Sequence, residues 1–441
     1  MTTAGLERRG LIELRGQLAF IEGVSGVAFH DGVDLVGSDG NVRPGRILAT
    51  TERGAIIEVF GITDGLALES SRIRFHGRPL RFGVGPELLG RVFDGLGRPR
   101  DGLPPPSTIE LREIGGSPIN PVRREYPRDF LETGISAIDA LNSVVLGQKI
   151  PIFTESGLAH DDLAMQIIRQ ARAPGVEKFA IVFAALGLSH DTAERYLEDF
   201  RAAGSRGRMI AFLNLASDPS AERLITPRCA LTAAEYLAFD AGYHVLVILH
   251  DITNYGESLR EISAARGEVP SRKGYPGYLY SDLASIFERA GRIAGRPGSL
   301  TQIPIVTLPS GDMTHPIPDL TGYVTEGQIV LDSEIARRGV YPPISVLPSL
   351  SRLMSDGIGK GRTREDHPKI AKRLYAGLAR VERARGLASI IGADELTEVE
   401  RRYLRFGERF ERELLSQKRD DARTIGETLD LALRVLGELP S

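Results

Sequence analysis

The sequence has little of several features that mark particular protein classes. Among its 441 residues Cys229 is the only cysteine, so no internal disulfide can form, which suits a reducing compartment. No apolar run reaches the roughly 18 residues of a membrane span, and the first ten residues lack a signal-peptide core. We therefore expect a chain that neither spans a membrane nor is secreted, while a peripheral place in a membrane complex stays open.

Excess charge and metal-ligand motifs are also missing. The net charge is −3, so no overall basic field points to nucleic acid, and we expect no nucleic-acid partner. The histidines are scattered, and the sequence has neither a cysteine pair nor a His-Glu-x-x-His motif. His250 and Asp251 are adjacent, but neighbouring residues of a strand point to opposite faces. The sequence therefore predicts no dedicated metal site.

The length of the chain exceeds that of one ordinary domain. With 42% hydrophobic and 26% charged residues, its composition is typical of globular proteins. We predict a multidomain chain with a small β domain, a barrel or a sandwich, over residues 1–75, an α/β domain over residues 76–350 and a helical bundle over residues 351–441. Short predicted strands, separated by turns such as GSDGN and TERG, indicate the β domain.

Five apolar runs in the central part are predicted to be buried parallel strands. Helical stretches such as 161–173 and 191–203 separate them, and this alternation indicates a three-layer α/β domain. The five runs are Lys149–Phe153, Phe179–Leu186, Met209–Leu215, His244–Leu249 and Ile303–Leu308.

The C-terminal part carries three apolar stripes with the 3/4 spacing of amphipathic helices. The short gaps between them predict a compact bundle. The first stripe is Ile370, Leu374, Leu378 and Val381, the second is Leu396, Val399, Tyr403, Phe406 and Phe410, and the third is Ile425, Leu429, Leu433 and Leu436.

The stretch Lys149–Asp162 has the setting of a phosphate-binding loop but not its chemistry. An apolar strand leads into a turn that contains Gly157, and an amphipathic helix follows. The loop should end in Gly-Lys-Ser/Thr, but the corresponding residues are Ala159, His160 and Asp161. A histidine, mostly uncharged at neutral pH, replaces the lysine that would neutralise phosphate. A carboxylate replaces the hydroxyl that would bind magnesium.

Asp161 and Asp162 also lie at the expected start of the helix. There they complement the helix dipole themselves and repel a phosphate that would otherwise bind. The local sequence leaves two interpretations open. Ser156 and Gly157 form an ordinary strand-to-helix turn capped by Asp161, or the loop is the relic of a nucleotide-binding fold that works through a partner.

Three further segments carry candidate functional residues. Asp251 ends an apolar strand, where a Walker-B-type magnesium ligand would lie; without a phosphate-loop lysine we interpret it as a cap. Arg352 lies in an apolar stretch, and a buried guanidinium is costly without a partner. Either Arg352 pairs with a carboxylate of its own chain, or it reaches a phosphate on a neighbouring subunit. The segment Gly267–Tyr280, with three tyrosines, predicts a long loop that forms a contact surface; stacking on a nucleobase is the less favoured alternative.

Several long motifs, in the right order, resemble the non-catalytic B subunit of V-type and A-type rotary ATPases. The likeness runs from the β domain to the final helix 424–439, and it favours the relic interpretation of the loop and the outward-reaching interpretation of Arg352. The motifs are Glu132–Phe153 (ETGISAIDALNSVVLGQKIPIF), Ser156–His160 (SGLAH), Leu249–Tyr255 (LHDITNY), Arg272–Tyr280 (RKGYPGYLY) and Pro348–Met354 (PSLSRLM).

The resemblance implies an N-terminal β-barrel, a central RecA-like domain with a degenerate P-loop and a C-terminal helical bundle. It also implies a hexameric ring in which three such subunits alternate with three catalytic A-type subunits around a rotating central stalk. Peripheral stalk subunits would hold the ring on the cytoplasmic side of a prokaryotic plasma membrane, above an ion-translocating sector.

By the same resemblance, Arg352 is an arginine finger that enters the neighbouring catalytic site. In other phosphoryl-transfer systems such a residue is worth about 10³–10⁵ in rate. The chain would need no cofactor of its own, because Mg-ATP or Mg-ADP would lie at the interface with the catalytic subunit. Gly157, His160 and Asp161 would form a degenerate loop with weak nucleotide binding or none.

Departures from the catalytic pattern agree with this role. We align Leu188 with the glutamate that orients the attacking water in the catalytic paralogue, so three substitutions remove the same chemistry. Ala159, Asp161 and His250 stand where the family commonly has Pro, Asn and Thr. The added charge of Asp161 disfavours ATP at this chain's own loop.

Two alternative functions stay open beside this non-enzymatic role. A self-sufficient NTPase with an unorthodox P-loop predicts magnesium-dependent nucleotide binding and turnover by the chain alone. A purely architectural ring spacer predicts near-normal turnover when Arg352 is replaced in an intact ring. The alpha subunit of F-type synthases is set aside because that family keeps its phosphate-binding lysine.

Overall fold

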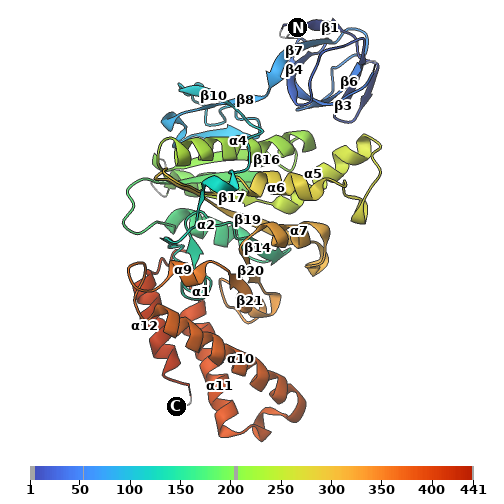
Figure 1. Cartoon of the computed structure of the whole chain (residues 1–441). Helices are drawn as coiled ribbons and strands as arrows, with labels where there is room; N and C mark the ends of the chain where they lie inside the picture. The colour runs from blue at the N-terminus through green and yellow to red at the C-terminus, as the bar shows by residue number, and fades with distance from the viewer. Residues whose placement is uncertain (1–4, 53, 203–206, 440–441) are drawn as a thin grey trace. The chain divides into compact units, whose positions relative to one another are not determined.

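The computed structural model describes residues 5–52, 54–202 and 207–439, and these fall into two compact units (Figure 1). The first unit comprises the chain up to residue 118 together with residues 181–241 and 249–289. The second comprises residues 119–180, 242–248 and 290–441. The domain boundaries at residues 75 and 350 stay predictions.

The first unit begins with an antiparallel β domain, as predicted. Its strands follow the order β1-β7-β4-β5-β6-β3-β2 and curl into a half-barrel (Figure 1). Side chains such as Val33, Leu35, Ile57 and Ile73 are fully buried and form its core. Buried residues alternate along a strand because every second side chain points to the same face of the sheet. The strands are β1 (Glu7–Arg9), β2 (Glu13–Arg15), β3 (Leu18–Glu22), β4 (Asp31–Val36), β5 (Val42–Thr50), β6 (Gly54–Val59) and β7 (Arg72–Pro79).

The same unit contains parallel strands covered by helices. β15 (Phe179–Leu188) pairs in parallel with β16 (Met209–Leu215), which pairs in parallel with β9 (Val92–Asp94). The predicted strands at 179–186 and 209–215 are thus confirmed. Both are buried almost throughout, which is typical of the continuous apolar strands of parallel sheets. The other elements of this unit are β8 (Arg81–Val84), β10 (Glu110–Glu113), α3 (His190–Ala202), α4 (Ser220–Phe239), α5 (Ile252–Ala265) and α6 (Leu279–Phe287).

The second unit holds the strand that leads into the candidate loop and the neighbours of that strand in the sheet. β14 (Ile152–Glu155) pairs in parallel with β19 (Ser299–Leu308) and β20 (Gly327–Leu331), and β21 (Ile344–Ser351) adds antiparallel to β20. The predicted strands at 149–153 and 303–308 are confirmed with shifted ends, and the run at 244–249 forms β17 (His244–His250). The shorter elements are β11 (Arg124–Glu125), β12 (Phe130–Leu131), α1 (Ser136–Leu141), β13 (Val144–Val145), α2 (His160–Gln170), β18 (Gly291–Ile293), α7 (Pro316–Val324), α8 (Ser333–Arg337) and α9 (Met354–Gly357).

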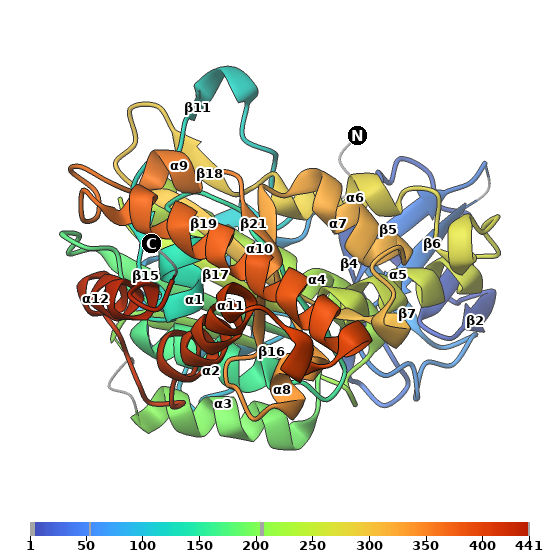
Figure 2. The ribbon, with the colours of Figure 1, turned by 90° about the horizontal axis from the view of Figure 1, so that it is seen from below.

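The C-terminal helices form the predicted bundle (Figure 2). α10 (His367–Ile391) packs against both α11 (Glu398–Arg409) and α12 (Ile425–Leu436). Two members of the predicted apolar stripes are not buried, because Val399 is 53% exposed and Leu433 is 42% exposed. Helical spacing identifies a face of a helix, but it does not say along which turns a neighbour covers that face.

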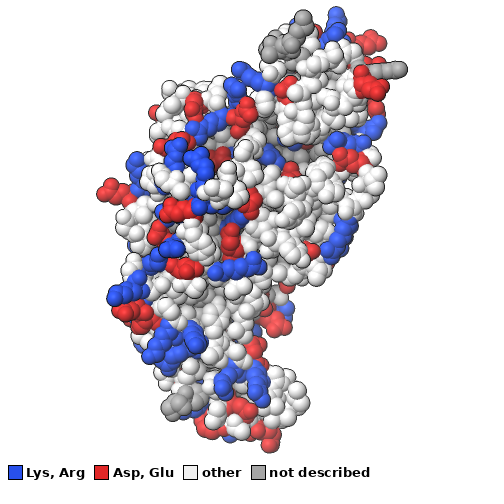
Figure 3. Space-filling model, in the orientation of Figure 1, with Lys and Arg blue, Asp and Glu red and all other residues white. Residues whose placement is uncertain are grey.

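The surface agrees with the small net charge. Basic and acidic side chains are interspersed over the face that Figure 3 shows. Within the described ranges, no helix combines the length and apolarity needed to cross a bilayer.

Candidate functional site

The degenerate loop has the predicted strand–turn–helix geometry. β14 ends at Glu155, and α2 begins at His160. Gly157 lies between them with a φ of 86°, a left-handed conformation that glycine adopts without strain. A β-carbon at this position would meet no atom within 4 Å, so the turn itself leaves open space.

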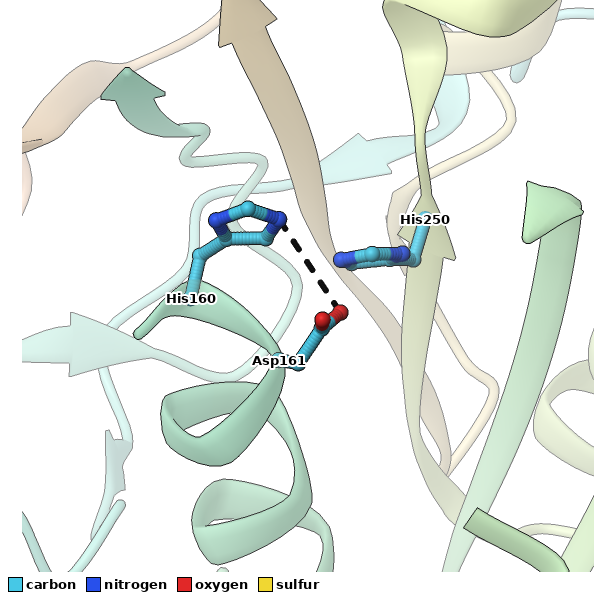
Figure 4. A group of neighbouring side chains, drawn as sticks. All are labelled: His160, Asp161 and His250. Atoms are coloured by element: carbon cyan, nitrogen blue, oxygen red, sulfur yellow. Dashed lines mark ion pairs between the residues drawn. The ribbon is translucent and has the colours of Figure 1, made fainter. Parts of the chain in front are cut away.

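The first turn of α2 carries the side chains that replace the phosphate-binding groups. Figure 4 shows His160 and Asp161 there, with His160 Nε2 3.9 Å from Asp161 Oδ1. His160 Nδ1 also lies 3.4 Å from Thr154 Oγ1. The Asp162 carboxylate pairs with the Arg419 guanidinium at 2.7 Å. Asp161 is therefore not the helix cap of the ordinary-turn interpretation: the N-cap is Ala159, which offers no side-chain hydrogen bond.

The electrostatics of this turn disfavour a phosphate. Two carboxylates stand within the first turn of α2, where the helix dipole favours negative charge. Asp161 and Asp162 fill that role themselves, and a phosphate approaching the free helix amides would meet like charge. No lysine or hydroxyl occupies the two positions that bind phosphate and magnesium in an intact loop. The loop is therefore a phosphate-loop geometry with an acidic lining.

Asp251 has the capping role predicted for it. Its carboxylate accepts a hydrogen bond from the main-chain N–H of Thr253 at 2.7 Å and caps α5. Leu188, the last residue of β15, is 6% exposed, so an apolar side chain occupies the position aligned with the missing glutamate.

His250, the third residue drawn in Figure 4, lies at the end of β17 and is buried beside Tyr196, with ring centroids 6.2 Å apart. His160 and Asp161 belong to the second compact unit, whereas residue 250 belongs to the first. The absence of a dedicated metal site stays a prediction.

Arg352 follows β21 and is exposed. Its main-chain N–H donates to the carbonyl of Glu326 at 3.1 Å, and its guanidinium Nη1 donates to the carbonyl of Thr325 at 3.3 Å. Throughout the described chain, no ion pair joins the Arg352 guanidinium to a carboxylate. The internal salt bridge, one of the two interpretations of this residue, is therefore not formed.

The surroundings of Arg352 hold it at the edge of a pocket. The two neighbours Ser351 and Leu353 are buried and anchor the backbone on either side. The pocket has a volume of about 450 Å³, and Leu350 and Tyr375 also line it. Because the terminal Nη1 donates to a neutral carbonyl, no carboxylate of the described residues compensates the positive charge of this guanidinium.

The tyrosine-rich segment divides into two parts. Tyr275 is buried, and its hydroxyl donates to Glu257. Tyr278 and Tyr280 are 37% and 48% exposed, so of the three tyrosines these two are accessible to a partner, and the contact surface itself stays a prediction. Sequence reasoning missed Arg419, because nothing local to that residue indicates a contact with Asp162.

Comparisons with known proteins agree with this geometry. Residues 134–351 match the nucleotide-binding domain of the ATP synthase alpha/beta family, and residues 356–441 match the C-terminal domain of V and A type ATP synthase. The chain is 54% identical over 434 residues to a V-type ATP synthase beta chain of Thermotoga neapolitana, covering 98% of this chain and 94% of that one. It is 53% identical over 435 residues to the V-type ATP synthase beta chain of Halothermothrix orenii, again covering 98% and 94%.

A solved structure shows the same likeness. The ATP synthase subunit NeqB from Nanoarcheaum equitans superposes with a TM-score of 0.77 at 36% identity. The match covers 93% of this chain and 99% of that chain.

Proposed function

Since the chain belongs to the ATP synthase alpha/beta family, among the V-type ATP synthase beta chains, we propose that it is a non-catalytic ring subunit that supplies Arg352 to an ATP site on a neighbouring subunit. The observation that carries the proposal is the exposed Arg352 guanidinium, bonded to a neutral carbonyl and paired with no carboxylate among the described residues. In that site it would stabilise the charge that develops on the transferring phosphoryl group.

The chemistry of the chain's own loop supports the non-catalytic half of the proposal. Three groups are needed there for hydrolysis: a lysine for phosphate, a hydroxyl for magnesium and a carboxylate for water. His160, Asp161 and Leu188 stand at these positions. Each replacement would impair the reaction, and together they would remove all three groups.

The proposed place of the chain is a hexamer in which it alternates with catalytic A subunits. Central stalk and peripheral stalk subunits would contact this ring on the cytoplasmic side of the membrane, where an ion-translocating sector is attached. Mg-ATP or Mg-ADP would bind at the interface with the catalytic subunit, and the chain itself would require no cofactor.

The test is ATP turnover of a ring reconstituted with the catalytic partner, with native Arg352 and with Arg352→Ala and Arg352→Lys. We expect a fall of at least two orders of magnitude for Arg352→Ala, within the range found for arginine fingers. We expect Arg352→Lys to recover little, because a lysine lacks the planar fork. Arg337→Ala is the matched control, since Arg337 is also exposed and its guanidinium donates to the Ser333 hydroxyl at 3.2 Å, with no ion pair to a carboxylate among the described residues.

Native mass measurements must first show that each variant assembles like the parent. Unchanged turnover of the intact Arg352→Ala ring would overturn the proposal in favour of an architectural spacer. Magnesium-dependent turnover by the chain alone would overturn it in favour of a self-sufficient NTPase.

A further inference from the structure

A second pocket lies in the first unit, apart from the loop and from Arg352. Its volume is about 580 Å³. Strands β5 and β6 of the half-barrel supply Arg46 and Glu58, and helices α4 and α6 supply Arg228 and Asp282. The half-barrel is tied to α4 beside it, because the main-chain N–H of Ala221 donates to Gln17 at 2.6 Å.

The charged groups of the pocket wall form ion pairs with one another. Arg46 Nε lies 2.6 Å from Glu58 Oε2, and Arg228 Nη2 lies 2.9 Å from Asp282 Oδ1. A third pair joins Arg266 to Glu268 at 2.6 Å. Three guanidinium groups thus face three carboxylates, and the wall has no net charge to select an anion or a cation.

Two buried atoms of these pairs lack a hydrogen-bond partner among the described residues. They are Glu58 Oε1, an acceptor, and Arg228 Nε, a donor. The Glu58 side chain is 0% exposed and that of Arg228 is 11% exposed. Buried polar groups are nearly always satisfied in folded proteins, and leaving one unsatisfied costs about 1–3 kcal/mol. A ligand that donates to Glu58 and accepts from Arg228 would satisfy both.

Aromatic rings also line the same pocket. Phe29 is 59% exposed and stacks on His30 with ring centroids 3.8 Å apart and an interplanar angle of 27°. Burial, with Arg46 and Arg228 nearby, lowers the pKa of His30 to about 4, so its imidazole is neutral at physiological pH. Tyr278, which also lines the pocket, is partly exposed. These rings offer flat faces on which a planar ligand stacks.

We propose that this pocket binds a neutral, planar heteroaromatic amine, a group with the chemistry of an adenine base. The exocyclic amino group donates to Glu58 Oε1, a ring nitrogen accepts from Arg228 Nε, and the ring stacks beside Phe29. Because the wall is electrically balanced, a phosphate on the ligand adds no affinity. The site is independent of the proposed role of Arg352, so either proposal can fail alone.

The test is binding of adenosine to the full-length chain, measured by calorimetry and by saturation-transfer NMR, with AMP and uridine as comparison ligands. We expect saturable binding of adenosine at one site per chain, AMP no tighter than adenosine, and uridine weaker because it lacks the exocyclic amine. Glu58→Gln should weaken adenosine binding at least about tenfold, since the amide keeps the shape but presents a donor to the ligand's donor. Phe29→Ala should weaken it about fivefold or more through lost stacking.

Phe29 is exposed, so its replacement does not endanger folding, and Phe29→Tyr should retain binding. Arg337→Ala is the control outside the pocket. The proposal would be overturned if adenosine shows no saturable binding to the native chain, if AMP binds clearly tighter than adenosine, or if both Glu58→Gln and Phe29→Ala bind like the parent.

Discussion

The carboxylate of Asp162, in the first turn of α2, lies 2.7 Å from the guanidinium of Arg419. Gln166, one turn further along α2, donates to the carbonyls of Lys418 and Asp421 at 3.1 and 3.0 Å. The segment before α12 therefore holds the helix that follows the former phosphate loop. Arg419 is 65% exposed, so its ion pair stabilises the fold by less than about 1 kcal/mol. Its main effect is to hold one carboxylate at the start of the helix.

The acidic lining of the loop leads to a gain-of-function prediction. The double substitution His160→Lys with Asp161→Thr restores a phosphate-binding cation and a magnesium-binding hydroxyl, and it removes one repelling carboxylate. We expect at least about tenfold tighter binding of Mg-ATP by the isolated chain, a gain of about 1.4 kcal/mol. Calorimetric titration with Mg-ATP measures it.

The chain offers a matched control for this experiment. α3 also begins with a His-Asp pair, His190 and Asp191, which are both exposed. The same substitutions there, His190→Lys with Asp191→Thr, change the charge equally without touching the loop. If both double variants bind Mg-ATP alike, the loop is not the remnant of a phosphate site.

A buried carboxylate in the first unit predicts a dependence of stability on pH. Burial, with Asp94 and Asp218 nearby, raises the pKa of Glu222 to about 7. Between about pH 4.5 and pH 7 the folded chain holds a proton that the unfolded chain has released, so the free energy of unfolding falls as the pH rises. Glu222→Gln should therefore be more stable than the parent at pH 8, by about 1–3 kcal/mol, and similar to it at pH 4.5.

Thermal unfolding at the two pH values tests this expectation. Glu69→Gln, at an exposed position, is the control and should show no such difference between the two pH values. A Glu222→Gln variant that is destabilised equally at pH 4.5 and pH 8 would mean that the carboxylate is a structural hydrogen-bond acceptor rather than a buried proton carrier.

The parts of the fold that could be predicted are those with a local signal. The run Met209–Leu215 is apolar at every position except the buried Asn214, as a parallel strand covered on both faces requires, and its observed bounds are the predicted ones. Val399 has the right helical spacing but lies at the second residue of α11, where nothing covers it. The spacing of apolar residues identifies one face of a helix, whereas the burial of that face depends on a packing partner elsewhere in the chain.

The candidate site divides in the same way. The strand, the turn at Gly157 and the helix start at His160 follow from neighbouring residues, so the sequence predicts them. The ion pair between Asp162 and Arg419 and the pocket around Glu58 join residues far apart in the chain, and no local pattern indicates either. The sequence likewise left open whether Arg352 pairs internally, because that depends on what lies across from it in the fold.

Two glycines of α10 lead to the last prediction: replacing each by alanine should change the free energy of unfolding in opposite directions. At Gly377 a β-carbon would lie 2.8 Å from Cε1 of Phe406 in α11 and 3.2 Å from Cδ2 of Leu439, whereas at Gly386 it would meet no atom within 4 Å. Gly377→Ala should lower the free energy of unfolding by about 1–3 kcal/mol through overpacking. Gly386→Ala should raise it by about 0.4–1 kcal/mol, because alanine restricts the unfolded chain and suits an exposed helix. Urea unfolding measures both variants. An unaffected Gly377→Ala would mean that α10 and α11 do not pack closely at Gly377, whereas a destabilised Gly386→Ala would mean that the helix does not accept a methyl group at Gly386.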